Sequence, residues 1–339
     1  MTTLNLGMVG AGRIGQVHAA NLAARVPGAR LVAIADIAFE AAQKLAGQYN
    51  VPHAYDNPEA ILDDPAIDAV IVASATDTHP AIIEGAAAAG KHIFCEKPIA
   101  RTLAEIDGAL AAVDRAGVKL QIGFNRRFDA NFARVRRAIV DGEIGQPHLL
   151  HIISRDPGPP PLSYIRVSGG IFLDMTIHDF DMARFLLGSE VVEVYTSGAV
   201  LVDPAIGEAG DIDTALVLLT FANGALGVID NSRRAVYGYD QRVEVLGSGG
   251  AIQTENKYPN AAIISTGDHI RRDLPLHFFL ERYADSFALE LAQFVEAVVH
   301  DRPTPVTGED GRIPVVMALA AAKSLHEKRP VRLDEIAPV

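Results

Sequence analysis

The chain has 339 residues, of which 49% are hydrophobic and 21% charged, a composition typical of a folded globular protein with two ordinary domains. Its formal net charge of −12 argues against nucleic acids and anionic membranes as partners, because both attract basic surfaces. One cysteine, Cys95, allows no disulfide within the chain. With no signal peptide pattern and no apolar run long enough to cross a bilayer, the sequence predicts a cytoplasmic protein.

Short apolar runs alternate with helix-length segments through the first third of the chain. Strands are predicted at residues 4–9, 29–35, 68–74, 92–95 and 119–124, with a short segment at 53–55. Helical patterns lie between them, at about 13–25, 39–48, 80–89 and 102–116. This alternation predicts parallel βαβ units, and right-handed crossovers then produce a doubly wound Rossmann sheet. We place this domain at residues 1–124.

A glycine pattern follows the first predicted strand. Gly10-x-Gly12-x-x-Gly15 opens a helix, and Asp36 ends the next strand. In dinucleotide-binding folds the first glycine allows the tight turn, the second lets the backbone approach a pyrophosphate, and the third lets helix and strand pack closely. The Asp36 carboxylate is suited to both ribose hydroxyls and would repel a 2′-phosphate. Because Ile37 and Ala38 offer no cation for that phosphate, the pattern predicts NAD rather than NADP.

Two further predicted strands end in polar loops at the edge where a doubly wound sheet collects its ligands. One strand ends in the run from Ser74 to Pro80, whose small polar groups could face a cofactor. The next runs directly into Glu96-Lys97-Pro98, which would bring Lys97 close to a nicotinamide ring. An ordinary surface pair of Lys97 with Glu96 is the alternative interpretation.

The pattern changes after residue 124, where we place the domain boundary. A basic helix extends to Val140, and strands then follow one another at 148–154, 191–201, 214–221, 225–232, 241–246 and 251–255. The turns Asn223-Gly224 and 247–250 are typical of hairpins. Residues 125–339 are therefore predicted to form an α+β domain with an open, mostly antiparallel sheet. Helices at 285–299 and 312–327 close the chain, and the last is able to pack back on the first domain.

The segment 169–181 begins with two glycines and continues as a predicted helix. Asp174, His178 and Asp181 are spaced i, i+4 and i+7, so they share one face. That face also carries Ile177 and Met182, and an imidazole and a carboxylate in an apolar neighbourhood need partners. From these residues alone, a buried and mutually satisfied pair and a substrate-binding pair are equally acceptable interpretations.

Together these motifs resemble the family of glucose–fructose oxidoreductase, inositol dehydrogenase and their relatives, over essentially the whole chain. The resemblance rests on the Gly10–Gly15 turn, Glu96-Lys97-Pro98, Gly123 to Asp129, Gly169 to Asp181, and Tyr237 to Asp240. It is closest to the bacterial members that oxidise myo-inositol. The resemblance implies NAD-dependent oxidation of a secondary alcohol of a cyclic polyol, with myo-inositol and 2-keto-myo-inositol as substrate and product, in a homotetramer.

The resemblance also implies roles for individual residues. Lys97, Asp174 and His178 match the catalytic lysine, aspartate and histidine of the family. The substrate site is expected to comprise Lys97, Arg127, Asp156, Asp174, His178, Tyr237 and Tyr239. The cofactor site is expected to comprise Gly10, Gly12, Arg13, Ile14, Gly15, Asp36, Ile37, Ser74, Thr76, His79, Glu96 and Lys97. Thr76, His79 and Glu96 match positions that hold the nicotinamide ribose, and Asp181 keeps a structural role.

These residue types suit the chemistry of alcohol oxidation, which removes a proton from oxygen and a hydride from carbon. A histidine is suited to accept the proton at neutral pH, so His178 is the expected acceptor. Asp174 would orient the imidazole or bind a neighbouring hydroxyl. Lys97 would donate to the reacting oxygen as alkoxide character develops.

Three other interpretations remain open in the sequence. The same scaffold could serve a scyllo-inositol or sugar dehydrogenase, because the proline-rich loop from Asp156 to Tyr164 would shape the pocket. A cofactor-bound sensor without turnover is a second alternative, since fold does not fix function. A metalloenzyme is the third, but no further Cys or His has convincing ligand spacing, so no metal is expected.

Overall fold

The computed structural model describes residues 3–337, which form two compact units. The first unit comprises Met1–Phe128 and Asp285–Ile313, and the second comprises Asp129–Ala284 and Pro314–Val339. The first unit therefore includes a late segment of the chain that the sequence analysis assigned to the second domain. The domain boundary at residue 124 stays a prediction.

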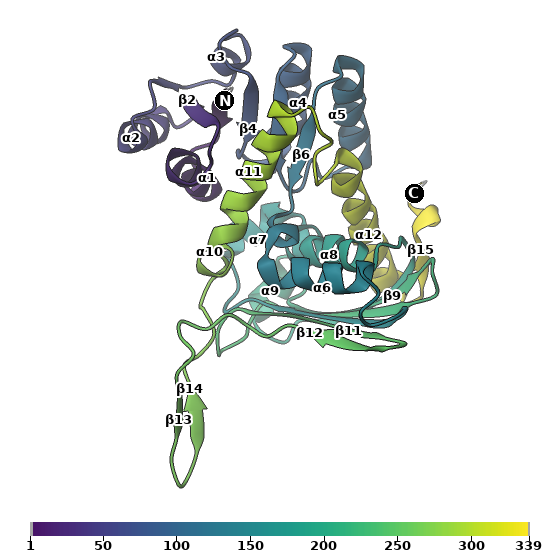
Figure 1. Ribbon diagram of the computed structural model, residues 1–339. Coiled ribbons are helices and arrows are strands. Elements are labelled where there is room, and N and C mark those ends of the chain that lie inside the picture. Colours follow the sequence, from purple (N-terminus) through teal and green to yellow (C-terminus); the bar gives the residue numbers. More distant parts are fainter. Residues whose placement is uncertain (1–2, 338–339) are drawn as a thin grey trace. The chain divides into compact units, whose positions relative to one another are not determined.

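Six parallel strands form the sheet of the first unit, in the order β3-β2-β1-β4-β5-β6 (Figure 1). The strands are β1 (Leu4–Val9), β2 (Ala29–Ala35), β3 (His53–Tyr55), β4 (Ala69–Val72), β5 (His92–Glu96) and β6 (Leu120–Gly123). The connecting helices are α1 (Arg13–Ala24), α2 (Phe39–Tyr49), α3 (Glu59–Leu62), α4 (His79–Ala88) and α5 (Leu103–Ala116). The strand order reverses between β1 and β4, and ligands of such sheets bind beyond the carboxyl ends of the strands at this point.

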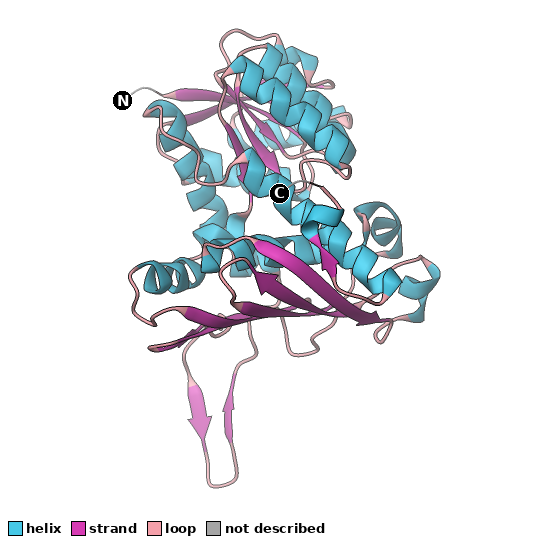
Figure 2. Cartoon of the chain, turned by 90° about the vertical axis from the view of Figure 1, so that its right-hand side faces the viewer, coloured by secondary structure: helices cyan, strands magenta, loops and turns pink. Residues whose placement is uncertain are grey.

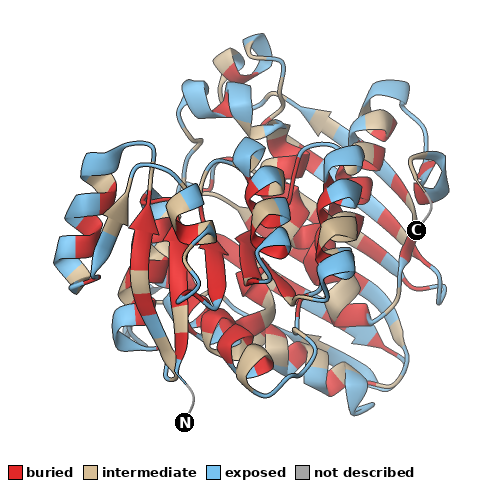
Figure 3. Ribbon diagram, turned by 90° about the horizontal axis from the view of Figure 1, so that it is seen from above, coloured by how far each residue is buried: buried red, intermediate tan, exposed pale blue. Residues whose placement is uncertain are grey.

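One face of the parallel sheet is covered by helices from both ends of the chain. Leu6 and Ile34 of the sheet belong to the same buried core as Leu22 of α1, and α11 (Ala284–Val299) adds Leu291 and Phe294 to it. Figure 3 shows the central strands of this sheet coloured mostly as buried. The strands β4 and β6 are buried along their whole length, so each is a continuous run without the alternation of a half-exposed strand, as expected inside a parallel sheet.

Seven strands form the sheet of the second unit, in the order β12-β11-β7-β10-β9-β8-β15. They are β7 (Pro147–Arg155), β8 (Val191–Ala199), β9 (Thr214–Phe221), β10 (Leu226–Ser232), β11 (Asp240–Gly247), β12 (Gly250–Gln253) and β15 (Val331–Arg332). All neighbours are antiparallel except β7 and β10, which are parallel. Along β9, buried Val217 and Leu219 alternate with exposed Leu216 and Leu218, so one face forms the core and the other faces outward.

The remaining elements of the second unit are helices and one separate hairpin. The helices are α6 (Ala130–Val140), α7 (Leu162–Ser168), α8 (Ile177–Leu187), α9 (Pro204–Glu208), α10 (Phe279–Arg282) and, shared with the first unit, α12 (Gly308–Glu327). The hairpin of β13 (Ile263–Ser265) and β14 (Ile270–Arg272) extends away from the large sheet (Figure 2). Within residues 3–337, no helix has both the length and the apolar character that a bilayer crossing requires.

These observations confirm the predicted fold class, a Rossmann sheet followed by an open, mostly antiparallel sheet with flanking helices. Some local features were not predicted. The expected loop from Asp156 to Tyr164 runs into α7, and the sequence did not indicate α3, α9, α10, β15 or the β13–β14 hairpin. These elements are short, and short elements carry too few residues for a period to stand out.

Candidate functional site

The turn after β1 has the backbone geometry of a dinucleotide site. Gly10 has φ +108°, and a Cβ there would lie 2.4 Å from the Ala73 carbonyl oxygen. A Cβ on Gly15 would lie 2.1 Å from the Gly10 carbonyl oxygen, so only glycine lets α1 start this close to the turn. A Cβ on Gly12 would have nothing within 4 Å, and no side chain caps the helix there. The exposed amides at the start of α1 thus remain accessible to a pyrophosphate.

Asp36 follows β2 and reaches back to this turn. Its Oδ2 accepts a hydrogen bond from the Ala11 amide at 2.7 Å, and its Oδ1 accepts one from the Ala38 amide at 2.8 Å. The carboxylate is therefore held at a fixed place beside the glycines, half-buried, while the Ile37 side chain is 94% exposed. A rigid carboxylate with an exposed apolar neighbour fits an adenosine without a 2′-phosphate.

The loop after β4 is tied to the loop after β5 by a histidine. The His79 ring is buried, with Nδ1 2.9 Å from the Pro98 carbonyl oxygen and Nε2 3.1 Å from the Ser74 carbonyl oxygen. Burial lowers the pKa of His79 more than these two carbonyl contacts raise it. The Ser74 and Thr78 hydroxyls are 2.6 Å apart, at the two ends of a short turn that contains Thr76. His79 thus connects the loops that the sequence analysis assigned to the cofactor.

Lys97 lies at the end of β5, in the sequence Glu96-Lys97-Pro98. Its side chain is half-buried, and the peptide bond that it forms with Pro98 is cis. The Glu96 carboxylate turns into the first unit, where its Oε1 lies 2.7 Å from His18 Nε2. The alternative interpretation made Glu96 a surface partner of Lys97. In the structure, the partner of the Glu96 carboxylate is instead a buried histidine of α1.

Arg127 also belongs to the first unit, in the turn that follows β6. Its Nη2 donates to Asp310 Oδ1 at 2.9 Å, and both side chains are mostly buried. Asp310 itself accepts from the Thr307 amide and hydroxyl, at 2.9 and 3.0 Å. The guanidinium predicted for the substrate site is thus fixed by a carboxylate from the start of α12.

The predicted helix at 169–181 is not a single α-helix. Residues Phe172–Thr176 form one π-helical turn, and α8 starts only at Ile177. The wider turn changes the α-helical spacing on which the shared face of Asp174, His178 and Asp181 was predicted. Between Ile171 and Ala183, Asp174 and His178 are the two residues that are not buried. Both therefore reach the surface of an otherwise buried segment, whereas Asp181 is fully buried.

Asp174 is held by two side chains that the sequence analysis did not assign to the site. Tyr164 of α7 donates its hydroxyl to Asp174 Oδ1 at 2.9 Å, and Arg233 donates from Nη1 to Oδ2 at 3.1 Å. Arg233 is 1% exposed and also contacts Asp211 Oδ2 at 3.4 Å. Two donors from different elements thus fix the position of this carboxylate.

The end of β10 positions the segment that carries Asp174 and His178. Asn231 of β10 donates from Nδ2 to the buried carboxylate of Asp179 at 2.9 Å, and its Oδ1 accepts from the Thr176 hydroxyl at 2.6 Å. Arg233 follows two residues later and binds Asp174. The π-helical turn and α8 are therefore fixed to the same strand end through buried polar groups. Losing one of these buried hydrogen bonds would destabilise the fold more than losing a surface contact.

Replacing Arg233 by methionine should destabilise the protein by about 3 kcal/mol, since it leaves the Asp174 and Asp211 carboxylates without their shared cation. We expect a clear fall in the thermal unfolding temperature, together with a loss of any activity that depends on Asp174. The control is Arg234→Met, which changes an exposed arginine one position away. An unchanged unfolding temperature for Arg233→Met would show that this buried contact contributes little.

The two tyrosines predicted for the substrate site lie in different surroundings. Tyr239 is buried, and its ring packs perpendicular to Tyr283 at 6.0 Å. Tyr237 accepts from Arg155 Nη1 at 3.0 Å and donates to Asp240 Oδ2 at 2.6 Å. Gly238, with φ +125°, lies between them in the chain.

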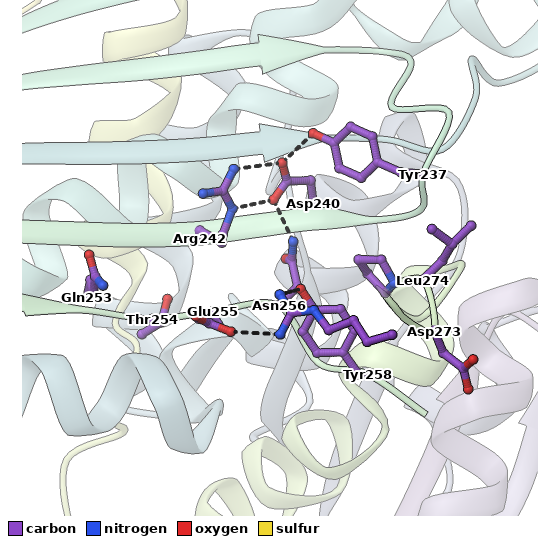
Figure 4. Close-up of a pocket in the computed structure, with 12 residues that line it drawn as sticks. Tyr237, Asp240, Arg242, Gln253, Thr254, Glu255, Asn256, Tyr258, Asp273 and Leu274 are labelled. Atoms are coloured by element: carbon purple, nitrogen blue, oxygen red, sulfur yellow. Dashed lines mark hydrogen bonds and ion pairs between the residues drawn. The ribbon is translucent and has the colours of Figure 1, made fainter. Parts of the chain in front are cut away.

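Tyr237 lies at the edge of a polar hollow of about 440 Å³ (Figure 4). Its lining residues are Tyr237, Asp240, Arg242, Gln253, Thr254, Glu255, Asn256, Tyr258, Arg272, Asp273, Leu274 and Pro275. Burial raises the pKa of Asp240, but hydrogen bonds from Arg242, Tyr237 and Asn256 outweigh this effect, so the pKa lies below its ordinary value. The hollow thus surrounds a carboxylate that is already satisfied, and Asp174 and His178 do not line it.

Asp156 is anchored through its backbone next to the loop that carries Arg233. Its amide donates to the Ser232 carbonyl at 2.9 Å, and its carbonyl accepts from the Ala235 amide at 2.6 Å. The structure thus brings Asp156 to the strand end that positions Asp174, and places Tyr237 in a separate network. Arg233, Tyr164 and Asp211 were missed because no spacing rule connects them with Asp174 in the sequence.

The chain matches two domain families over parts of its length, and it matches several proteins along nearly its whole length. Residues 4–124 match an oxidoreductase family with an NAD-binding Rossmann fold, and residues 132–253 match the GFO/IDH/MocA C-terminal domain. It is 50% identical to a myo-inositol 2-dehydrogenase of Thermotoga maritima and 49% identical to an inositol 2-dehydrogenase of Rhizobium meliloti, in each case over 98% of this chain and 99% of the other. A crystal structure of scyllo-inositol dehydrogenase from Lactobacillus casei, with bound NAD(H) and scyllo-inositol, matches with a TM-score of 0.92 at 28% identity, covering 98% of this chain and 100% of the other.

Proposed function

Because the chain belongs to the GFO/IDH/MocA family of NAD-binding oxidoreductases, we propose that it oxidises myo-inositol to 2-keto-myo-inositol with NAD. The observation that carries the choice of substrate is the 50% identity with the myo-inositol 2-dehydrogenase of Thermotoga maritima over 99% of that protein. Similarity of this extent over both domains supports the same reaction more strongly than the fold alone would.

The residues of the first unit fit the cofactor. Gly12 leaves its side-chain space open at the start of α1, and the Asp36 carboxylate is fixed beside it for the ribose hydroxyls. When bound, NAD supplies the nicotinamide ring that accepts the hydride. The protein's own contribution is to bind and align the reactants and to move the hydroxyl proton.

We assign the proton to the His178 imidazole. Histidine is the side chain that most readily takes up a proton near neutral pH, and His178 reaches the surface of a buried segment that is fixed to β10. A general base on a rigid element keeps its distance to the hydroxyl constant. Loss of that proton from the alcohol allows the carbon to release its hydride.

Asp174 and Lys97 complete the proposed chemistry. The Asp174 carboxylate, held by Tyr164 and Arg233, would bind a substrate hydroxyl or stabilise the protonated imidazole. The Lys97 ammonium would donate to the reacting oxygen and stabilise its developing negative charge. Arg127, Asp156 and Tyr239 are proposed to bind the remaining hydroxyls of the ring.

A panel of myo-inositol, scyllo-inositol, glucose and xylose with NAD tests the substrate, with NADH absorbance as the measurement. We expect kcat/KM for myo-inositol to exceed the others by at least about tenfold, since a misplaced hydroxyl leaves a buried polar group unpaired. A preference for scyllo-inositol would move the protein to the activity of its more distant relatives, such as the Bacillus subtilis enzyme that is 39% identical. No turnover of any polyol or sugar would contradict the proposed function.

We further propose a cytoplasmic homotetramer. The outward face of the seven-stranded sheet supports association, since Leu216, Leu218 and Leu226 are each 51% exposed on neighbouring strands. An apolar sheet face of this kind commonly packs against another chain. The one cysteine, Cys95, is buried and free, which suits a reducing compartment.

A further inference from the structure

Three ionisable side chains meet inside the first unit, behind the end of β5. They are His18 of α1, Glu96 of β5 and Glu290 of α11, and we call them the Glu96 cluster. One nitrogen or oxygen atom from each lies within 4.8 Å of the others. His18 and Glu290 are fully buried, and Glu96 is 9% exposed. Ionisable side chains are rarely buried together unless they are paired or contribute to function.

The Glu96 cluster is packed against aromatic rings and against β6. The His18 ring meets the edges of Phe94 and Phe287, with ring centres at 5.4 and 6.1 Å. On β6, a Cβ at Gly123 would lie 3.1 Å from the Glu96 carboxylate, a tight contact that would require the carboxylate to shift. Gln121 of the same strand donates from Nε2 to the Glu290 backbone carbonyl at 2.9 Å. The cluster is therefore enclosed by α1, β5, β6 and α11.

Glu290 differs from Glu96 in its partners. The Glu96 carboxylate lies 2.7 Å from His18 Nε2, whereas neither Glu290 oxygen has a hydrogen-bond partner among the described residues. Burial, and next to it the charge of Glu96, raise the pKa of Glu290 well above its ordinary value. A second carboxylate ion here would be desolvated and repelled, so the neutral acid is the stable form.

The residues on both sides of Lys97 are held by buried histidines. On one side, His18 binds the Glu96 carboxylate, and on the other, His79 Nδ1 lies 2.9 Å from the Pro98 carbonyl oxygen. Lys97 directly follows the last residue of β5, so these two contacts hold the backbone on both sides of the lysine. The position of the lysine thus depends on contacts that lie outside the reacting groups.

We propose that the Glu96 cluster is a positioning device for Lys97, in which His18 holds the Glu96 carboxylate and Glu290 stands beside it as an uncharged acid. The proposal rests on the catalytic role proposed above for Lys97. The same side chains are of types that bind divalent cations. We favour a hydrogen-bonded cluster over a cation site, because the 2.7 Å contact of His18 with Glu96 requires a hydrogen between the two atoms, which a cation would displace.

The first test compares the unfolding temperature of the wild type with that of Glu290→Gln between pH 5 and pH 9. Glutamine keeps the size of the neutral acid and cannot ionise. A buried acid with a raised pKa stabilises the fold at low pH, and this stabilisation is lost as the pH rises towards its folded pKa. The wild type should therefore lose stability relative to Glu290→Gln as the pH rises. The unfolding temperature of Glu290→Gln minus that of the wild type should increase by several degrees between pH 5 and pH 9.

The comparison isolates Glu290 because the other titratable groups near Glu96 are unchanged in the variant. These groups are His18 and Glu96 themselves, Cys95 on the same strand, and His79 on α4. A gap that stays constant with pH would contradict the neutral acid. A Glu290→Gln protein that is less stable, alongside a wild type that Mn²⁺ or Zn²⁺ stabilises and EDTA destabilises, would overturn the proposal in favour of a cation site.

The second test separates positioning from general stability. His18→Leu should lower kcat for myo-inositol by about tenfold or more, with the NADH dissociation constant from fluorescence changed less than threefold, because misplacing a catalytic group costs rate rather than binding. His18→Gln places an amide nitrogen near the Nε2 position and should recover most of that loss. The control is His92→Leu at the other end of β5, which removes the hydrogen bond from the Lys119 amide at 3.0 Å.

The outcomes also separate this proposal from the proposed function. Equal kcat losses in His18→Leu and His92→Leu, or no recovery in His18→Gln, would show a merely structural role and overturn the positioning. A wild type that does not oxidise myo-inositol would contradict the proposed function, while the pH test on Glu290→Gln, which needs no substrate, would still decide the charge state of the cluster.

Discussion

Replacing His178 by alanine is expected to lower kcat for myo-inositol oxidation by about a thousandfold, the usual effect of removing a general base. Lys97→Ala should lower it by about a hundredfold or more, because the reacting oxygen loses the donor that stabilises its negative charge. NAD binding should survive in both variants, since the glycine turn and Asp36 are unchanged. Stopped-flow or steady-state NADH absorbance gives the rates, and fluorescence titration with NADH gives the binding.

Two matched variants control for general damage to the protein. His151→Ala changes an exposed histidine of β7, and Lys119→Ala changes a lysine that pairs with Asp301 at 2.8 Å, away from the proposed chemistry. Both should keep rates within about twofold of the wild type, as surface substitutions usually do. Near-normal turnover in Lys97→Ala or His178→Ala would remove that residue from the chemistry.

The second large effect concerns the cofactor. The wild type should prefer NAD over NADP by at least about a hundredfold in kcat/KM, because the Asp36 carboxylate would lie beside the 2′-phosphate and repel it. Asp36→Ser combined with Ile37→Arg should reverse much of this preference. The serine hydroxyl can still accept from a backbone amide, as Asp36 does, and the arginine would occupy a site where Ile37 is 94% exposed.

Ile37→Arg alone is the control for the double variant. It adds the cation without removing the carboxylate, so its gain with NADP should be small. Comparable kcat/KM for the two cofactors in the wild type would contradict the interpretation of Asp36. A double variant that loses NAD activity without gaining NADP activity would show that Asp36 mainly supports the turn through Ala11 and Ala38.

Much of the first unit could be predicted because its signals are local. Gly10, Gly12 and Gly15 follow a strand and open a helix, and each glycine meets the steric condition that its position in the motif implies. The alternation of strands and helices then determines a parallel sheet, since the crossover has only one favourable hand. Asp36 and Lys97 were identifiable because each directly follows a strand, at the edge where ligands collect.

The site of the second unit was only partly predictable. The spacing of Asp174 and His178 indicated a common face, and both do reach the surface, but the π-helical turn at Phe172–Thr176 has no period that a sequence reveals. Tyr237 and Tyr239 stand two residues apart and were expected to serve one site. In the fold, Tyr239 packs against Tyr283 whereas Tyr237 donates to Asp240, and such partners are determined by contacts of the folded chain.

The fold class and the glycine turn with its acidic partner could be predicted from the sequence, because these follow from neighbours within one or two elements. The residues proposed for the chemistry came from the family resemblance, and what holds them in place becomes visible only in the folded chain. Arg233 lies 59 positions from Asp174, and His18 lies 78 positions from Glu96. No periodicity connects such pairs, since a buried charge finds its partner through chain topology and the exclusion of water.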